Sequence, residues 1–453
     1  MKKLSVFGEV RLTEGNIWQK IILFAIPLLI SSLIQQLYNT ADLIFVGNYL
    51  DKQATIAVGS GSLLITCIIN FFTGLSVGTS VVMGQFFGAG DKDSMHRTVH
   101  TAIVLCLVGG TILAFIGILG APLFLKILNI SSDILPLGVI YMRIYFMSIF
   151  SIMFFNIGSG ILRAIGDSTS PMLYQFIGGI TNVAANYVFI VILNMGISGA
   201  AFATFASQSV AALLIIRKLM KLPDEYRLRL NKIRIDSSVL NKIIKIGIPS
   251  GIQGMLLTLS NLVVQSNINM LEINSIAAFV AYYKVELFIY LPIQAIGQAS
   301  MTFVSQNVGA DKPVRARKGI YSCILIGIVV SVCASVLLIQ MSDVVFSLFT
   351  KDESVIEIGY EIIKVTFPYY FIYVFLEVFS NTLRGAGHSI QPMLIILLNM
   401  CGVRVVMVYL MMHVAQTAQG IAVVYPVTWL TASVSMIIYF KISNCLEKNS
   451  KKK

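Results

Sequence analysis

Hydrophobic positions in this chain fall in long continuous runs, which short polar connections separate. An α-helix needs about 20 apolar residues to cross a lipid bilayer. Runs of that length recur about twelve times, whereas a transmembrane β-barrel would show shorter segments of alternating polarity. The pattern therefore predicts twelve membrane-spanning helices, near residues 17–46, 54–80, 97–120, 136–159, 170–194, 197–219, 238–267, 276–302, 316–340, 357–383, 391–413 and 420–442.

The composition is that of a polytopic membrane protein. Of the 453 residues, 57% are hydrophobic and only 12% are charged, whereas soluble domains contain about 25% charged residues. A chain this apolar cannot hide its surface in a water-soluble core, so we expect it to lie in the lipid bilayer. The six cysteines are scattered without a C-x-x-C spacing, which predicts neither a disulfide framework nor a metal site.

The net charge of +12 is distributed unevenly along the chain. Of the 33 Lys and Arg residues, 26 lie in the two tails and in every second connection, and only 3 lie in the other connections. This asymmetry follows the positive-inside rule. We therefore expect both termini in the cytoplasm, a location in the plasma or inner membrane, and no nucleic-acid partner.

The sequence repeats itself once, at a nearly constant offset. Three pairs of segments match in the same order: FAIPLLI (24–30) with IGIPSGI (246–252), MGQFFGAGDK (83–92) with VSQNVGADK (304–312), and LRAIGDSTSPML (162–173) with LRGAGHSIQPML (383–394). Matches at nearly one offset indicate two duplicated halves. Each half holds six predicted helices, and an even number makes both halves enter the membrane from the same side.

These observations predict an all-α membrane protein built from two parallel six-helix repeats around a central cleft. We expect an N-lobe at 1–219, a basic cytoplasmic linker at 220–237 and a C-lobe at 238–453. The chain has no G-x-x-x-x-G-K-[ST] loop, no H-E-x-x-H and no G-x-S-x-G. The sequence therefore favours a secondary transporter without a cofactor, driven by an ion gradient, over an ATP-driven pump, an enzyme or a receptor.

A polar stripe runs along the first predicted helix. Ser31, Gln35, Tyr38, Asn39 and Asp42 fall on one helical face. Lipid cannot satisfy such a stripe, so it is expected to face protein or water. Burial disfavours the charged form of a carboxylate, so the acid at the end of this stripe could also carry a proton. The alternative is an aspartate at the outer membrane interface, satisfied by water.

The chain resembles the multidrug and toxic compound extrusion (MATE) transporters over nearly its whole length. The resemblance rests on Pro27 and Pro249, on LYNTADLIFVG (37–47), and on the duplicated G-A-(G)-D and L-R-x-x-G segments. It implies Na⁺- or H⁺-coupled antiport that exports small organic, often cationic, compounds. A lipid-linked oligosaccharide flippase of the same superfamily is the alternative. Flippases tend to carry several basic residues in the cavity, whereas here only four basic residues lie within spans.

The resemblance also implies site residues. Asp42 matches the family's coupling aspartate, with Tyr38 and Asn39 beside it, and Asn182, Asn186 and Thr204 match the polar positions of the fifth and sixth helices. The position of Asn186 is commonly an aspartate, so this chain has one negative charge fewer. Carboxylate, amide and hydroxyl oxygens suit a hard cation such as Na⁺. Asp42, Asn182, Asn186 and Thr204 therefore form a candidate Na⁺ site, and the coupling ion is Na⁺ or H⁺. We expect the protein to act as a monomer.

The C-lobe contributes further ionisable residues within predicted spans. Charged residues inside a membrane are functional hypotheses by default, and here they are Glu286, Glu377 and Arg404.

The candidates for a substrate cavity come from both lobes. They are Gln35 and Asn156 of the N-lobe and Glu286, Glu377 and Arg404 of the C-lobe. Glu377 and Arg404 could instead form a structural ion pair. Pro27 and Pro249 can kink helices 1 and 7, because proline lacks an amide donor, and are therefore candidate hinges.

Overall fold

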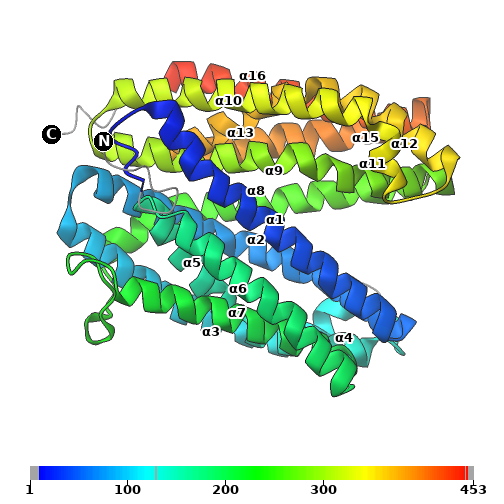
Figure 1. Ribbon diagram of the computed structural model, residues 1–453, viewed down its shortest axis with the longest axis horizontal. Coiled ribbons are helices and arrows are strands. Elements are labelled where there is room, and N and C mark those ends of the chain that lie inside the picture. The colour runs from blue at the N-terminus through cyan, green and yellow to red at the C-terminus, as the bar shows by residue number, and fades with distance from the viewer. Residues whose placement is uncertain (1–9, 128–129, 444, 447–453) are drawn as a thin grey trace. The chain divides into compact units, whose positions relative to one another are not determined.

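The computed structural model describes residues 10–127, 130–443 and 445–446, and their regular structure is helical (Figure 1). Eleven of its helices are long and apolar enough to span a membrane, and one bent pair supplies a twelfth span. The spans are α1 (Ile17–Tyr49), α2 (Lys52–Ala89), α3 (Lys92–Ile127), α4 (Leu135–Met147) with α5 (Ile149–Ala164), α6 (Thr169–Asn186) with η1 (Tyr187–Ile192), α7 (Gly196–Met220), α8 (Ser237–Ile268), α9 (Ile273–Gly309), α10 (Pro313–Gln340), α12 (Glu353–Thr366) with η3 (Phe367–Tyr369) and α13 (Tyr370–Gly385), α14 (Ile390–Ile396) with η4 (Leu397–Val403) and α15 (Arg404–Val414), and α16 (Ala418–Ser443). The predicted twelve-helix architecture is confirmed.

The chain divides into two compact units. Of the described residues, unit 1 contains 10–11 and Ile30–Gly251, and unit 2 contains Leu12–Leu29 and those from Ile252 onward. The first part of α1 therefore belongs to unit 2, and the first part of α8 belongs to unit 1. Pro27 and Pro249 lie inside these two continuous helices, close to the division. They remain hinge candidates, because a missing amide hydrogen bond weakens the helix where it passes from one unit to the other.

Unit 1 is built around α2, α3, α5 and α7. Its main hydrophobic core joins residues of these four helices, such as Met83, Val99, Ile157 and Ile215. The predicted linker takes part in this core, because Leu222, Tyr226 and Leu228 are buried within it. The linker segment is therefore packed against unit 1 through these apolar residues, which fix it to the ends of the helices.

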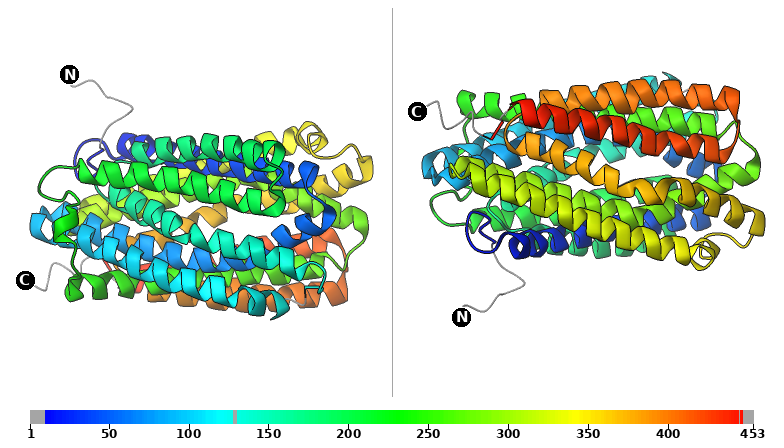
Figure 2. Two further views of the ribbon diagram at one scale, coloured as in Figure 1. Left: turned by 90° about the horizontal axis from the view of Figure 1, so that it is seen from below. Right: turned by 90° about the horizontal axis from the view of Figure 1, so that it is seen from above.

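In unit 2, α9 packs against α10, α12 and α13, and α13 packs against α16. Figure 2 shows the red α16 alongside the orange α13 and α15. Among the described residues, the largest fully buried side chains of this unit are aromatic and come from α1, α9, α11 (Ser342–Ser347), η3 and α13: Phe24, Phe279, Tyr282, Phe303, Phe346, Phe367 and Tyr370. Buried rings provide large apolar contacts, and the tyrosines also supply hydroxyl groups that can reach polar partners inside the unit.

Two spans are interrupted at equivalent places in the repeat. The fourth span bends by 42° between α4 and α5, where Ser148 donates its hydroxyl to the carbonyl of Tyr145. In the other half, the 3₁₀ turn η3 separates α12 from α13 and contains Pro368. Ser148 and Tyr369 are separated by the same offset as the matched segments 162–173 and 383–394. Each half thus breaks its fourth helix, once with a serine that bonds back to the preceding turn and once with a proline.

Asp236 caps α8 and fastens it to α3. Its Oδ1 accepts hydrogen bonds from the backbone N–H groups of Ser238 and Val239, both at 3.0 Å, and its Oδ2 lies 3.2 Å from Nη1 of Arg97. The hydrogen bond from Val239, followed by those from Ser238 and Arg97, holds the pKa of this carboxyl below its usual value. The folded protein therefore favours the ionised form of Asp236.

We expect Asp236→Ala to destabilise the protein by about 1 kcal/mol, the usual cost of a lost N-cap. Asp236→Asn should cost less, because an amide oxygen still caps the helix. Since the folded pKa is lowered, the stabilisation is fully present above about pH 4 and is lost as the pH falls through the folded pKa. Thermal unfolding in detergent from about pH 8 to about pH 3.5 measures both effects. Asp224→Ala is the control, because the Asp224 side chain is 69% exposed; an equal loss in both variants would contradict the capping role.

Candidate functional site

Asp42 lies in unit 1 beside two asparagines from the fifth span. Asn186, at the end of α6, donates its Nδ2 to Oδ1 of Asp42 and also lies 3.2 Å from Oδ1 of Asn182, one turn earlier. Asn182 and Asn186 are buried, and Asp42 is partly buried. The structure therefore brings together three of the predicted site residues from α1 and α6, although these two helices are far apart in the sequence.

Three other predicted members lie differently. Thr204 donates its hydroxyl to the carbonyl of Ala200 in α7 at 3.3 Å, and no hydrogen bond described here joins it to Asp42. Gln35 and Asn39 are exposed on α1. Gln35 and Asn39 share a helical face with Asp42, but no described hydrogen bond joins either side chain to the buried asparagines.

Tyrosines surround the Asp42 carboxylate. Tyr38 accepts a hydrogen bond of 3.2 Å from Nε2 of Gln175. Tyr38, Tyr141 and Tyr145 interact electrostatically with Asp42. Sequence reasoning missed Tyr141 and Tyr145, which interact with the acid, and Gln175, which is hydrogen-bonded to Tyr38. Phenols flank the carboxylate with polar groups that carry no charge at neutral pH.

The arrangement suits a small cation or a proton. Within the described residues, no ion pair reaches Asp42, and its hydrogen-bond donor is a neutral amide. Oδ1 of Asn186 and Nδ2 of Asn182 are buried without a hydrogen-bond partner. If the Asn186 amide turned over, its unpaired oxygen would face Asp42 and the site would present only oxygen atoms, the ligands that hard cations prefer.

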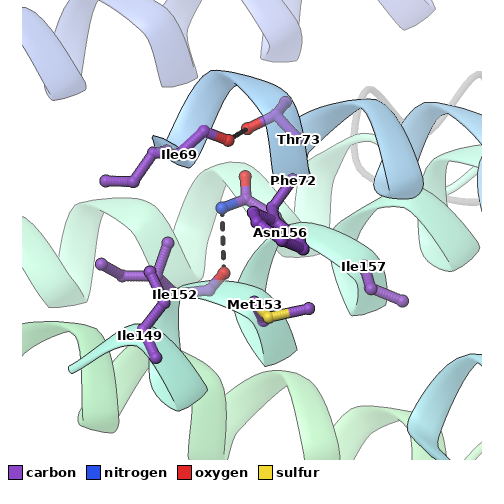
Figure 3. A pocket seen from close by; sticks show the side chains of 8 residues that line it. All are labelled: Ile69, Phe72, Thr73, Ile149, Ile152, Met153, Asn156 and Ile157. Carbon is purple, nitrogen blue, oxygen red and sulfur yellow. Dashed lines mark hydrogen bonds between the residues drawn. The ribbon is translucent and has the colours of Figure 1, made fainter. Parts of the chain in front are cut away.

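Asn156 lines a small cavity between α2 and α5 in unit 1. Figure 3 shows its side chain among Ile69, Phe72, Thr73 and Met153. Its Nδ2 donates to the carbonyl of Ile152 at 2.9 Å. The cavity volume is about 10 Å³, which is room for about one water molecule and far below the roughly 300 Å³ of a small-molecule site. In this conformation the cavity is too small for an organic substrate, and a substrate role for Asn156 stays a prediction.

Unit 2 contains two further intramembrane acids. Glu286 of α9 accepts hydrogen bonds from the hydroxyls of Tyr282, at 3.2 Å, and Tyr370. Glu377 of α13 accepts a bond of 2.7 Å from Nδ2 of Asn381. Both acids are only partly buried, and the hydrogen-bond donors described for them are neutral. Unit 2 therefore holds two further candidate acids for the exchange of a proton or a cation.

Arg404 does not form the ion pair with Glu377 that the sequence left open. Its guanidinium contacts Asn261, Met400 and Thr428, and no described contact joins it to Glu377. The charged residue that interacts with Glu377 is Arg384 of the duplicated L-R-x-x-G segment. This difference arises because Arg404 lies on α15 and points toward α8 and α16, whereas Glu377 is on α13 with Gly297 of α9 packed against it.

The chain has twelve apolar spans in two repeats, and both units contain acids whose described hydrogen-bond donors are neutral. These features define a polytopic membrane protein of the secondary-transporter type. The chain belongs to the MatE family, whose model matches it twice, at residues 27–188 and 249–410. The two matches begin at Pro27 and Pro249, and each covers one of the two repeats. The internal duplication is therefore confirmed.

Known proteins with similar sequence or structure agree with this assignment. The chain is 24% identical over 439 residues to the "Probable multidrug resistance protein YoeA" of Bacillus subtilis, covering 95% of this chain and 94% of the relative. It is 27% identical to "Probable multidrug resistance protein YpnP" of the same organism, covering 85% and 86%. A solved outward-facing multidrug resistance MATE transporter superposes with a TM-score of 0.91 at 22% identity, covering 98% of this chain and all of that chain.

Proposed function

We propose that this protein is a Na⁺- or H⁺-coupled antiporter that exports small organic compounds from the cell. The observation that carries the coupling proposal is the Asp42 site. A carboxylate inside a membrane-spanning unit, bonded to the neutral amide of Asn186 and without an ion-pair partner among the described residues, can exchange a proton or a cation. The names of the multidrug relatives support the choice of exported organic compounds as substrates.

Coupling requires only that the ion binds one conformation more tightly than the other. In the proposed cycle, an external cation or proton binds Asp42 and releases the substrate, and the substrate favours the cation-free conformation from the cytoplasmic side. The first parts of α1 and α8, each of which belongs to a different unit from the rest of its helix, are suited to link the site to a rearrangement of the units. We further propose that the protein acts as a monomer in the plasma or inner membrane, with both termini in the cytoplasm.

The flippase alternative receives less support from the basic residues. Three of the four that lie within spans, Arg143, Lys284 and Lys364, are exposed, and Lys364 pairs with Glu361 at 3.1 Å. Of the four, Arg404 alone is buried. A pyrophosphate-linked glycolipid would be expected to need several inward-facing cations.

Everted membrane vesicles test the proposal. A proton gradient or a sodium gradient is imposed separately, and the uptake of ethidium is followed by fluorescence. We expect one of the two gradients to drive uptake in vesicles that contain the protein, and not in vesicles that lack it. Response to only one gradient identifies the coupling ion. No uptake with either gradient, together with ATP-dependent uptake, would contradict secondary antiport.

A further inference from the structure

Arg404 is a buried cation near the middle of the eleventh span. Only 3% of the residue is exposed, and it begins α15 directly after the π-helical turn η4. Burying a guanidinium inside a membrane-spanning unit carries a large desolvation cost unless an acid or several good acceptors surround it. The partners of Arg404 therefore decide what this position does.

All the contacts described for Arg404 are neutral. Nη1 lies 3.2 Å from Oδ1 of Asn261, and Nη2 lies 3.2 Å from Sδ of Met400 and 3.4 Å from Oγ1 of Thr428. The guanidinium carbon lies 5.1 Å from the ring centre of Tyr425. Nε is buried without a hydrogen-bond partner. A guanidinium has five donors in a planar fork, so three bonds to neutral acceptors leave its charge uncompensated and Nε without a partner.

None of the acids described in unit 2 fills this deficit. Glu286, the acid that interacts with Arg404 electrostatically, accepts hydrogen bonds from Tyr282 and Tyr370, and no described ion pair joins it to Arg404. Tyr425 interacts with both charges and is hydrogen-bonded to Tyr283 at 2.9 Å. The acid and the cation are thus held separately, with a tyrosine that interacts with both.

Asn261 lies between the buried guanidinium of Arg404 and the exposed surface of unit 2. Its side chain contacts Nη1 of Arg404, and the residue itself is exposed. A ligand that displaces the Asn261 amide would meet the fork of the guanidinium directly. The neighbouring π-helical turn η4 is a local widening of the helix of the kind that is frequent at functional sites.

In each repeat, the first and fifth spans meet through a charged residue and an asparagine, and the two charges have opposite signs. In unit 1, α1 and α6 meet through Asp42 and Asn186; in unit 2, α8 and α15 meet through Asn261 and Arg404. The nearest matched segments, 162–173 and 383–394, have an offset of 221, so Arg404 corresponds to Val183, the neighbour of Asn182. The contact that holds an acid and amides in one repeat thus holds an amide and a cation in the other.

We propose that Arg404, with Asn261, binds the carboxylate of an amphipathic organic anion or zwitterion, which reaches the guanidinium by displacing the exposed Asn261 amide. A carboxylate matches the planar fork and supplies the charge that the neutral contacts lack. This inference names a substrate class for the proposed transporter. It rests on the transport function, but it is independent of the coupling role of Asp42.

A matched pair of dyes tests the inference. Rhodamine 110 carries a free carboxylate, and rhodamine 123 is its methyl ester. Fluorescence polarisation with the purified protein in detergent, without any ion gradient, gives the affinity for each dye. We expect Arg404→Gln to weaken the acid dye by about tenfold or more, as is typical for loss of a charge-assisted hydrogen bond, and to change the affinity for the ester by less than about twofold.

Two further variants separate binding from folding. Asn261→Asp keeps the guanidinium but gives it an internal carboxylate, so it should also weaken the acid dye selectively. Arg404→Lys should retain part of the preference, because the charge remains without the fork. Equal effects of Arg404→Gln on both dyes, or no binding of the acid dye by the unmodified protein, would overturn the inference. Failure of gradient-driven transport with these affinities unchanged would instead contradict only the coupling proposal.

Discussion

Asp42→Asn is expected to abolish gradient-driven accumulation of substrate while leaving the protein folded. With one-to-one exchange, a hundredfold ion gradient can support up to about a hundredfold substrate gradient, since each tenfold step corresponds to about 1.4 kcal/mol. An amide neither takes up a proton nor offers a negative charge to a cation. The ion then no longer distinguishes the two conformations, and the accumulation ratio in proteoliposomes should fall to about one.

The matched control is Asn39→Ala, less than one turn earlier on α1. Asn39 is polar like Asp42, but it is exposed, and no described contact joins it to the buried asparagines. We expect this variant to retain accumulation. Exchange of labelled for unlabelled substrate, measured without an ion gradient, should persist in Asp42→Asn and shows that the variant still transports. Undiminished accumulation in Asp42→Asn would move the coupling role to Glu286 or Glu377 in unit 2.

The twelve spans could be predicted from the sequence because lipid imposes a strict rule. Every backbone polar group in the bilayer must find a partner within the protein, so each span becomes a helix and each helix is a long apolar run. The bend of the fourth span at Ser148 was not predicted, since a serine inside an apolar run does not differ in sequence from a serine in a straight helix. The assignment of the first part of α1 to unit 2 was not predicted either, because it depends on which distant residues pack together.

The candidate site could be predicted only in part. The acid at position 42 and the amides at 182 and 186 were recognisable as polar residues in apolar helices, and the structure brings them together. The phenol of Tyr370 that holds Glu286 comes from a different span, and no periodicity connects the two residues. Periodicity assigns a face to each helix, but it does not say which face of another helix lies opposite.

The close contact of α2 with the first part of α8 is a feature of unit 1 that sequence reasoning missed. Gly74 and Gly78 on α2 lie against Gly251 and Gly247 on α8. A Cβ atom added to Gly74 would lie 2.1 Å from the backbone nitrogen of Gly251, and one added to Gly78 would lie 2.3 Å from the carbonyl oxygen of Ile243. Both pairs have the G-x-x-x-G spacing that lets membrane helices approach closely.

We expect Gly78→Ala to destabilise unit 1 severely. Helix propensity alone predicts a gain of about 1 kcal/mol for alanine over glycine. The added methyl group, however, meets backbone that cannot rotate away, so the helices must separate at a cost of about 3 kcal/mol or more. The packing cost is larger than the propensity gain. Because the same packing surrounds Gly74, Gly74→Ala should have a similar effect.

Gly47→Ala is the matched control, because no atom lies within 4 Å of a Cβ added there. It should leave stability unchanged or raise it by up to about 1 kcal/mol. A thiol-reactive fluorophore measures thermal unfolding in detergent, in a background where the other five cysteines are replaced by alanine. Cys106 is then the thiol that reports, because it is buried in the core of unit 1 and becomes reactive only when that core opens. If Gly78→Ala unfolded at the same temperature as Gly47→Ala, α2 and α8 would not approach as closely as this contact requires, and the first part of α8 would have to be held in unit 1 by the Asp236 cap and by the side chains around it.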